Sequence, residues 1–182
     1  PGEFVFAAMH LDHGHIGGMT QGLLDAGGTL KWVYDTQPER AKAFQEKFPQ
    51  VKIASSEEEV LSDPEVLLVA AAAIPVDRAP LGIRVMEAGK DYFTDKTPLI
   101  SLEQLAEAKA AVARTGKKYM VYYSERIHVE AAVLATQLIQ KGAIGKVLQV
   151  TGMGPHRMGD PSSRPDWFFE RARYGGILTD IG

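Results

Sequence analysis

The stretch FVFAAMHLDHGHIGGM, residues 4–19, decides the fold class because it joins a strand, a turn and a helix start. Phe4–Met9 is an apolar run typical of a buried strand. Ile16–Asp25 has the apolar spacing of a helix and ends at the glycine pair Gly27–Gly28. A strand that leads through a glycine-containing turn into a helix is typical of a dinucleotide-binding βα unit.

The same alternation continues through the first two-thirds of the chain. We expect further strands at Leu30–Tyr34, Val51–Ile53, Val66–Ile74, Asp91–Thr94 and Lys118–Tyr123. We expect helices at Pro38–Phe48, after a capping box at Ser56 and Glu59, at Val76–Ala88, from Ser101 and Gln104 to Gly116, and at His128–Lys141. The run VLLVAAAAI at 66–74 has no polar alternation, which favours a central strand buried on both faces. The sequence therefore predicts an α/β fold with a doubly wound parallel sheet of the Rossmann type.

After Gly145 the pattern changes. Lys146–Met153 alternates in part, as a strand of an open sheet does, and a loop rich in Pro, Gly and Ser leads to the aromatic patch Trp167–Phe169. The chain stops within the apolar stretch YGGILTDIG. We predict a dinucleotide-binding domain over residues 1–124. Residues 125–182 are expected to form a linking helix and the start of an incomplete α+β domain for substrate binding or oligomerisation.

Composition narrows the class of protein. The chain has 182 residues, 45% hydrophobic and 24% charged, as is typical of soluble globular proteins. Its net charge of −3 disfavours nucleic acid as a partner, and no apolar run approaches the roughly 20 residues that span a bilayer. The absence of cysteine excludes disulfides, thiolate catalysis and cysteine-ligated zinc, and it fits a reducing compartment. We therefore predict a cytoplasmic protein, although the first residue, Pro1, leaves the original N-terminus and any signal peptide open.

The turn after the first strand departs from the usual glycine fingerprint. Glycines are expected near His10, Asp12 and His15, and none of these is glycine, whereas Gly14 lies among them. A tight turn and close approach of the pyrophosphate to a helix N-terminus are the physical reasons for small residues here. We predict that His10, Asp12, His13, Gly14 and His15 form the turn that approaches the cofactor. A carboxylate such as Asp12 would weaken pyrophosphate binding unless its side chain points away.

Asp35 supports a nucleotide site. It ends the second strand, 23 positions after Asp12, where an acidic residue binds the ribose hydroxyls of NAD and repels the extra phosphate of NADP. The alternative is that Asp35 only begins a turn before Pro38. We predict NAD as the cofactor and NADP as the less favoured one.

The spacing His10-x-x-His13-x-His15 also raises the alternative of a metal site, because imidazole is a common zinc ligand. The spacing matches no familiar zinc pattern, and a sharp turn is expected to splay these side chains. Histidines that line a nucleotide cleft, or ordinary turn residues, are the favoured interpretations, and we assign no metal ligand.

Three later segments carry a resemblance to a known family. They are Ala71–Pro75 (AAAIP), Glu87–Lys96 (EAGKDYFTDK) and Tyr174–Gly182 (YGGILTDIG). In this order and spacing the chain resembles the glucose–fructose oxidoreductase/inositol dehydrogenase (Gfo/Idh/MocA) family of NAD(P)-dependent sugar and polyol oxidoreductases. The resemblance implies that NAD lies across the carboxyl ends of the strands, with Ala73, Ile74 and Pro75 bordering its nicotinamide.

The resemblance also implies two catalytic candidates. Lys96 corresponds to the lysine of the family's Glu/Asp-Lys-Pro motif, although Thr97 stands where proline is usual. From position alone, a surface lysine in an ion pair is the favoured interpretation of Lys96, whereas the resemblance favours a lysine in the cleft that is also a cofactor-binding residue. Asp180 matches the aspartate of the family's Gly-Gly-x-x-x-Asp-x-Gly-x-His motif, whose histidine would fall two positions beyond Gly182.

The expected function is the NAD-binding portion of an oxidoreductase that transfers a hydride between a nicotinamide cofactor and a sugar or polyol. Because the expected histidine is not in the chain, we expect weak or no turnover from this fragment, and enzymatic activity is left open. A homo-oligomer is possible. The alternative is a non-catalytic Rossmann-like module that binds a nucleotide or a protein partner.

Overall fold

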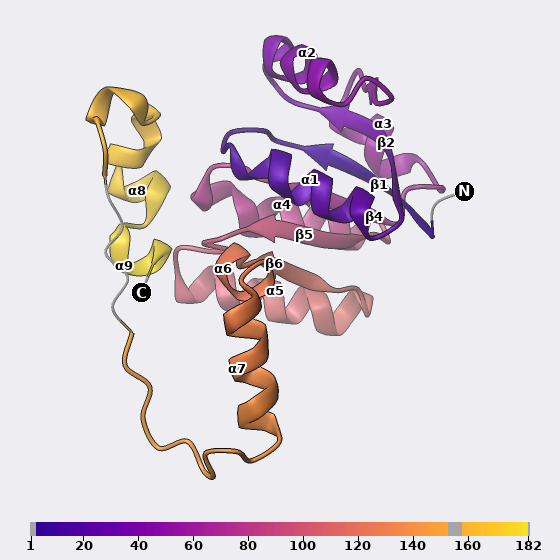
Figure 1. Cartoon of the computed structure of the whole chain (residues 1–182). Coiled ribbons are helices and arrows are strands. Elements are labelled where there is room, and N and C mark those ends of the chain that lie inside the picture. Colours follow the sequence, from indigo (N-terminus) through magenta and orange to yellow (C-terminus); the bar gives the residue numbers. More distant parts are fainter. Residues whose placement is uncertain (1–2, 153–157, 182) are drawn as a thin grey trace. The chain divides into compact units, whose positions relative to one another are not determined.

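A six-stranded parallel sheet forms the core of the computed structural model, which describes residues 3–152 and 158–181 (Figure 1). The strands are β1 (Phe4–Met9), β2 (Gly28–Tyr34), β3 (Lys52–Ile53), β4 (Leu68–Ala71), β5 (Asp91–Asp95) and β6 (Tyr119–Tyr122). Their order in the sheet is β3-β2-β1-β4-β5-β6, and every neighbouring pair is parallel. This is the strand order of the dinucleotide-binding Rossmann fold, so the predicted fold class is confirmed.

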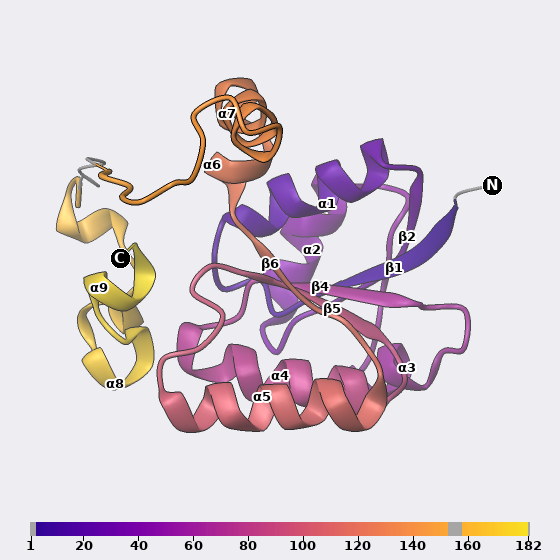
Figure 2. The same ribbon diagram turned by 90° about the horizontal axis from the view of Figure 1, so that it is seen from below.

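Helices cover both faces of the sheet (Figure 2). They are α1 (His15–Asp25), α2 (Pro38–Lys47), α3 (Glu57–Ser62), α4 (Pro75–Glu87) and α5 (Leu102–Thr115). Successive residues of β1 point to opposite faces, because Phe6 and Ala8 belong to one buried cluster and Ala7 and Met9 to the other. Both faces of the central strands are therefore buried, as the unbroken apolar runs predict.

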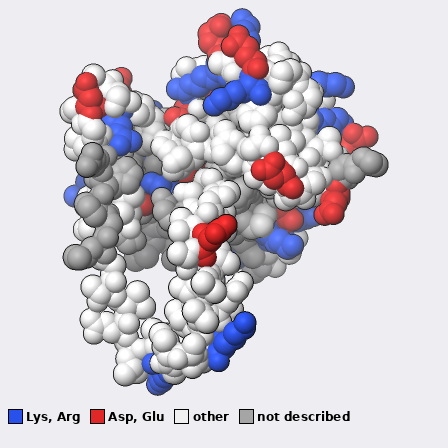
Figure 3. All heavy atoms as spheres, in the orientation of Figure 1, with Lys and Arg blue, Asp and Glu red and all other residues white. Residues whose placement is uncertain are grey.

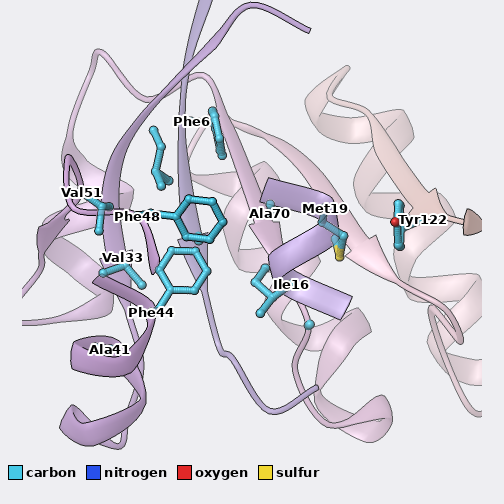
Figure 4. Packing of buried hydrophobic residues seen from close by; sticks show 13 residues of the cluster. Phe6, Ile16, Met19, Val33, Ala41, Phe44, Phe48, Val51, Ala70 and Tyr122 are labelled. Atoms are coloured by element: carbon cyan, nitrogen blue, oxygen red, sulfur yellow. The ribbon is translucent and has the colours of Figure 1, made fainter. Parts of the chain in front are cut away.

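The first cluster joins α1 and α2 to the sheet (Figure 4). Ile16 and Met19 of α1 and Phe44 of α2 pack against strand residues such as Phe6 and Val33. The second cluster brings residues of α3, α4 and α5 against the other face. Together these clusters hold the carboxyl ends of the strands in fixed positions, which a cofactor site at that edge requires.

Local capping explains where two helices begin. The Ser56 hydroxyl accepts the backbone N–H of Glu59, and the Ser101 hydroxyl accepts that of Gln104. The capping box at Ser56 differs from the expected form because the Glu59 carboxylate accepts the backbone N–H and hydroxyl of Ser55 rather than the N–H of Ser56.

The central strand is shorter than the sequence indicates. The apolar run 66–74 contributes only Leu68–Ala71 to the ladder, although Ala72 still forms backbone hydrogen bonds with His10 and His13 in the turn after β1. Ala73 is still fully buried although it lies beyond the last pair. Burial, which the sequence encodes as hydrophobicity, therefore extends beyond the hydrogen-bonded strand.

Contacts divide the chain into two compact units. The first unit contains 1–122 and 165–182, and the second contains 123–164. The segment 165–182 therefore belongs with the sheet, although it follows the second unit in sequence. The predicted domain boundary after residue 124 stays a prediction.

The second unit contains α6 (Ser124–Ile127), α7 (Glu130–Gln140) and the 3₁₀ turn η1 (Pro161–Ser163). The strand expected at Lys146–Met153 is wrong over its described part, 146–152, which has no strand, and Met153 lies outside the described residues. A strand needs a hydrogen-bonded neighbour, and Leu148 remains 86% exposed instead of covering a core.

The segment that rejoins the first unit contains η2 (Asp166–Phe169), α8 (Arg171–Tyr174) and α9 (Ile177–Asp180), and α8 contacts α4. The predicted aromatic patch is split by burial: Trp167 is buried, whereas Phe169 is 54% exposed. Tyr174 is buried beside Phe168, with ring centroids 4.3 Å apart. These aromatics anchor the segment that carries Asp180.

Acidic and basic side chains are both spread over the surface seen in Figure 3, in keeping with the small net charge. Within the described part of the chain, none of the helices combines the length and apolar character needed to cross a bilayer.

Candidate functional site

A cleft of about 280 Å³ lies at the carboxyl ends of the strands. Four of the predicted cofactor residues meet here or beside it: His10 and Asp12 follow β1, while Ala73 and Ile74 follow β4. Pro75 is the first residue of α4, next to this lining. The full lining is His10, Asp12, Thr36, Ala73, Ile74, Asp77, Pro80, Leu81 and Arg84.

The turn between β1 and α1 takes a conformation that usually requires glycine. His10, at the first position of the expected fingerprint, has a φ of +51°. Histidine is one of the side chains that tolerate this left-handed region, at some cost in strain. The turn is fixed by its neighbours: the His10 N–H donates to the carbonyl of Tyr34, and the His13 N–H donates to that of Ala72. The chain thus preserves the backbone bend of the fingerprint without its glycine.

The His10 ring leads away from the other two histidines. Its Nε2 lies 3.0 Å from Oε2 of Glu57, whose other carboxylate oxygen accepts Nε of Arg84 at 2.8 Å. Burial alone would raise the pKa of the Glu57 carboxyl, but hydrogen bonds from Arg84 and His10 lower it overall. His10 is thereby held at the α3 side of the cleft.

His13 and His15 converge on one buried carboxylate. Nδ1 of His15 lies 2.9 Å from Oδ1 of Asp95, in hydrogen-bond geometry, and Nδ1 of His13 lies 2.8 Å from Oδ2 of Asp95. The two rings meet edge to face with centroids 4.2 Å apart. The expectation that the turn splays these side chains is therefore wrong for this pair, because Asp95 at the end of β5 draws them together. We call His13, His15 and Asp95 the Asp95 cluster.

Arg78 completes the environment of Asp95. Its guanidinium is buried, with Nη2 3.3 Å from Oδ2 of Asp95 and Nε 2.6 Å from the carbonyl of Ala73. It also donates to the carbonyls of Lys96 and Thr97. Burial alone would raise the pKa of the Asp95 carboxyl, but the nearby His13 ring, the hydrogen bond from His15 and the charge of Arg78 hold it well below its usual range. Arg78, on α4, thus links the segment that follows β4 to the segment that follows β5 and carries Lys96.

Asp12 and Asp35 are both engaged within the chain. Arg40 of α2 donates to the Asp12 carboxylate, which neutralises the charge that would oppose a pyrophosphate. The Asp35 side chain is 1% exposed, and its oxygens accept the N–H groups of Leu11 at 2.6 Å and Gln37 at 2.8 Å. Asp35 therefore stabilises the turns after β1 and β2, and its contact with a ribose stays a prediction.

The two catalytic candidates lie in direct contact. Lys96 Nζ is 2.8 Å from Oδ1 of Asp180, with side-chain exposures of 12% and 9%. The Tyr174 hydroxyl donates to the other oxygen, Oδ2, of Asp180 at 2.6 Å. The peptide bond between Lys96 and Thr97 is cis. The two residues, 84 positions apart, thus form one network at the carboxyl end of β5.

The start of α1 suits the pyrophosphate of a dinucleotide. The helix begins after Gly14 without a side-chain cap, so its N-terminal N–H groups are not satisfied by a capping side chain. A Cβ at Gly14 would meet no atom within 4 Å, so open space lies beside this backbone. The residues present therefore fit the phosphate part of the cofactor, since a helix N-terminus attracts anions.

Matches to known proteins agree with this geometry. Residues 7–123 match the Gfo/Idh/MocA oxidoreductase family with its NAD-binding Rossmann fold. The chain belongs to this family. Residues 133–182 match the C-terminal domain of Gfo/Idh/MocA proteins, so both predicted regions have family counterparts. The predicted family and its NAD-binding Rossmann fold are confirmed.

Individual relatives of the family resemble the chain over much of its length. D-xylose dehydrogenase of Paenarthrobacter nicotinovorans is 26% identical over 78% of the chain and 37% of its own length. Levoglucosan dehydrogenase of Pseudarthrobacter phenanthrenivorans is 28% identical over 83% of the chain and 39% of its own length. A crystal structure of a putative oxidoreductase from Erwinia carotovora atroseptica is 47% identical, with a TM-score of 0.92 over 99% of the chain and 54% of that protein. The chain thus spans about two-fifths of these curated relatives and half of that structure.

Sequence reasoning missed three residues of the site: Asp95 as a partner of the histidines, Arg78 and Tyr174. Asp95 ends β5 and His13 follows β1, and carboxyl ends of parallel strands meet at one edge. The rule that strand ends meet at one edge does not say which ends are neighbours. Because β4 lies between β1 and β5 in the sheet, the contact between Asp95 and the histidines follows only from the observed strand order. Arg78 and Tyr174 carry no such signal, because each acts through contacts with distant backbone or side-chain groups.

Proposed function

We propose that the chain is the NAD-binding portion of an oxidoreductase that transfers a hydride between a nicotinamide cofactor and a hydroxyl-bearing carbon of a sugar or polyol. The observation that carries this proposal is the Lys96–Asp180 pair at the carboxyl end of β5. Membership in an NAD-binding family indicates the cofactor, and Lys96 and Asp180 are groups that can accept or donate a hydroxyl proton.

Each part of the site has a role in this proposal. The N-terminus of α1 at Gly14 would hold the pyrophosphate, and Ala73, Ile74 and Pro75 would border the nicotinamide. When bound, NAD supplies the hydride-accepting carbon. Lys96 would bind the reacting hydroxyl and take part in moving its proton, while Asp180 orients the ammonium group. Asp35 accepts one N–H group on each carboxylate oxygen, from Leu11 and Gln37, and would use a remaining lone pair for a ribose hydroxyl.

Sugar or polyol is the substrate class because two curated relatives are named as dehydrogenases of D-xylose and levoglucosan. A cytoplasmic location is part of the same proposal, and it rests on the lack of cysteine rather than on the fold. Self-association through residues 123–164 is likewise proposed, because apolar side chains such as Leu134 and Leu148 are exposed there.

Binding is tested by titrating NADH into the chain and following energy transfer from its two tryptophans. We expect saturable binding that weakens at least about tenfold in Gly14→Ala, because the added methyl fills the space beside the helix N-terminus. Gly17→Ala is the matched control, since a Cβ there meets only Nζ of Lys47, at 3.6 Å. Equal affinity in all three proteins, or no saturable binding, would contradict the proposed cofactor site.

Catalysis is tested separately with Lys96→Gln. We expect the weak NAD reduction by the parent chain, measured at high protein concentration with D-xylose, levoglucosan or polyols, to fall to the background seen without protein, because a lost acid–base group lowers the rate by about a hundredfold or more. NADH affinity should remain close to that of the parent chain. Loss of NADH binding in parallel with activity would show that Lys96 supports the structure of the cleft instead.

A second candidate function is a nucleotide-binding module without redox chemistry. The observation that favours it is Thr97, which stands directly after Lys96 where the catalytic motif of the family has proline. Saturable NADH binding by the parent chain, with no NAD reduction above background and no sugar or polyol that changes the NADH affinity, would select this candidate over the oxidoreductase.

A further inference from the structure

The Asp95 cluster has the donors of a metal site. One ligand atom from each of His13, His15 and Asp95 can be chosen so that all three lie within 4.8 Å of one another. Nδ1 of His13 lies 2.8 Å from Oδ2 of Asp95 yet lacks hydrogen-bond alignment, and it is a buried nitrogen without a hydrogen-bond partner. Buried polar atoms normally have a hydrogen-bond partner, so this nitrogen has a lone pair or a proton that no group in the described structure uses.

We propose that His13, His15 and Asp95 bind a zinc ion. Two imidazoles and one carboxylate are the protein ligands of many zinc sites that keep a further position open. The nitrogen donors favour zinc over magnesium and calcium, which prefer oxygen ligands. Tetrahedral bonds of about 2.0–2.1 Å place ligand atoms about 3.3 Å apart. The nitrogen–oxygen separations of 2.8 and 2.9 Å therefore need to open by only about half an ångström.

The surroundings of the cluster hold the ligands in place. Arg78 contacts Asp95 from within the protein, and a second hydrogen-bonded group behind a ligating carboxylate is the usual arrangement of metal sites. Although Arg78 is cationic, three backbone carbonyls also accept its N–H groups, and its contact with Asp95 is the long one at 3.3 Å. Oδ1 of Asp95 accepts the hydrogen bond of His15, and loss of that Nδ1 proton would leave both atoms free to bind a cation.

The two histidines are reachable from solvent, whereas the carboxylate is not. The exposed fractions of the side chains are 26% for His13 and 36% for His15, against 0% for Asp95. An ion can therefore enter from the histidine side and displace the Nδ1 proton of His15. The proposal depends on neither NAD binding nor hydride transfer, so it can fail while the proposed function stands.

The test is calorimetric titration of zinc chloride into the chelator-treated chain, prepared without a polyhistidine tag. We expect one ion per chain, with affinity at least about tenfold weaker in His13→Gln and in His15→Gln. His10→Gln is the matched control because it removes an imidazole from the same turn whose Nε2 contacts Glu57 instead. It should bind zinc as the parent chain does.

Cobalt substitution checks the ligands directly. A four-coordinate Co²⁺ ion with imidazole ligands absorbs visible light strongly, and this signal should be lost in His13→Gln and His15→Gln and kept in His10→Gln. Circular dichroism confirms that each variant is folded. Absence of stoichiometric zinc binding in the folded parent chain, or an equal loss in His10→Gln, would overturn the proposal and leave the cluster as a hydrogen-bonded network. A parallel NADH titration of the chelator-treated chain reports separately on the proposed function.

Discussion

Helices α4 and α7 show how differently the two units use similar sequences. Both helices have apolar residues at helical spacing, yet Leu81, Val85 and Met86 of α4 are at most 1% exposed. Not one residue of α7 is buried, and Leu134 and Leu138 are 56% and 46% exposed. The amphipathic pattern is therefore the same in both helices, but only α4 packs its apolar face against other buried residues.

The difference teaches where the stability of the chain resides. In the first unit, helices and sheet share two buried clusters, and burial of apolar area is the main favourable term in folding. Within 123–164, the described apolar side chains mostly stay in contact with water. We infer that this unit adds little to the free energy of unfolding. A partner surface that covers its apolar side chains would increase that contribution.

The largest expected effect comes from the same substitution made in each helix. Leu81→Ala should lower the free energy of unfolding by about 2–5 kcal/mol, because it leaves a cavity in a packed cluster. Leu134→Ala should change it by less than about 0.5 kcal/mol, since the side chain is exposed. Urea denaturation followed by circular dichroism measures both. Comparable losses in the two variants would break the comparison and show that α7 covers a surface in solution.

The elements of the first unit could be predicted from sequence because their signals are local. The run Phe4–Met9, the caps at Ser56 and Ser101, and the strand–helix alternation each specify one element, and the handedness of crossovers then leaves few sheet orders. The strand expected at Lys146–Met153 was wrong over 146–152 because its local alternation is real but its pairing partner is not in the described chain.

The site was predictable only in part. Local order placed His10, Asp12 and Gly14 in the turn after β1, but the direction of each side chain depends on residues far away in sequence. Asp95 is 80 positions from His15. A family resemblance named Lys96 and Asp180 as separate candidates, but it did not predict their direct contact. Side-chain networks between distant strand ends require the sheet order before they can be seen.

The second expected effect tests whether 165–182 is part of the stable unit. Tyr174→Phe removes the hydroxyl that donates to Asp180 and leaves the buried ring in place. We expect a loss of about 1.5 kcal/mol in the free energy of unfolding, the lower range for a hydrogen bond to a charged group. Tyr123→Phe, at an exposed tyrosine of the second unit, is the control and should be neutral. No loss in Tyr174→Phe would mean that this segment detaches before the sheet unfolds.

The smallest expected effect is a pH dependence of the free energy of unfolding that comes from Asp63, in the first unit. Burial alone would raise the pKa of the Asp63 carboxyl, but hydrogen bonds from Lys31 and Trp32 lower it to about 2. Since the folded pKa lies below the ordinary value of 3.8, the stabilisation is present above about pH 4 and is lost as the pH falls toward 2. Solvent screening limits it to about 1 kcal/mol. Asp63→Asn should therefore flatten the decline in urea midpoint over this range, whereas Glu130→Gln, in α7 of the second unit where no residue is buried, should leave it unchanged. An equal flattening by both variants would show that acid stability is shared by the two units and is not a property of the sheet.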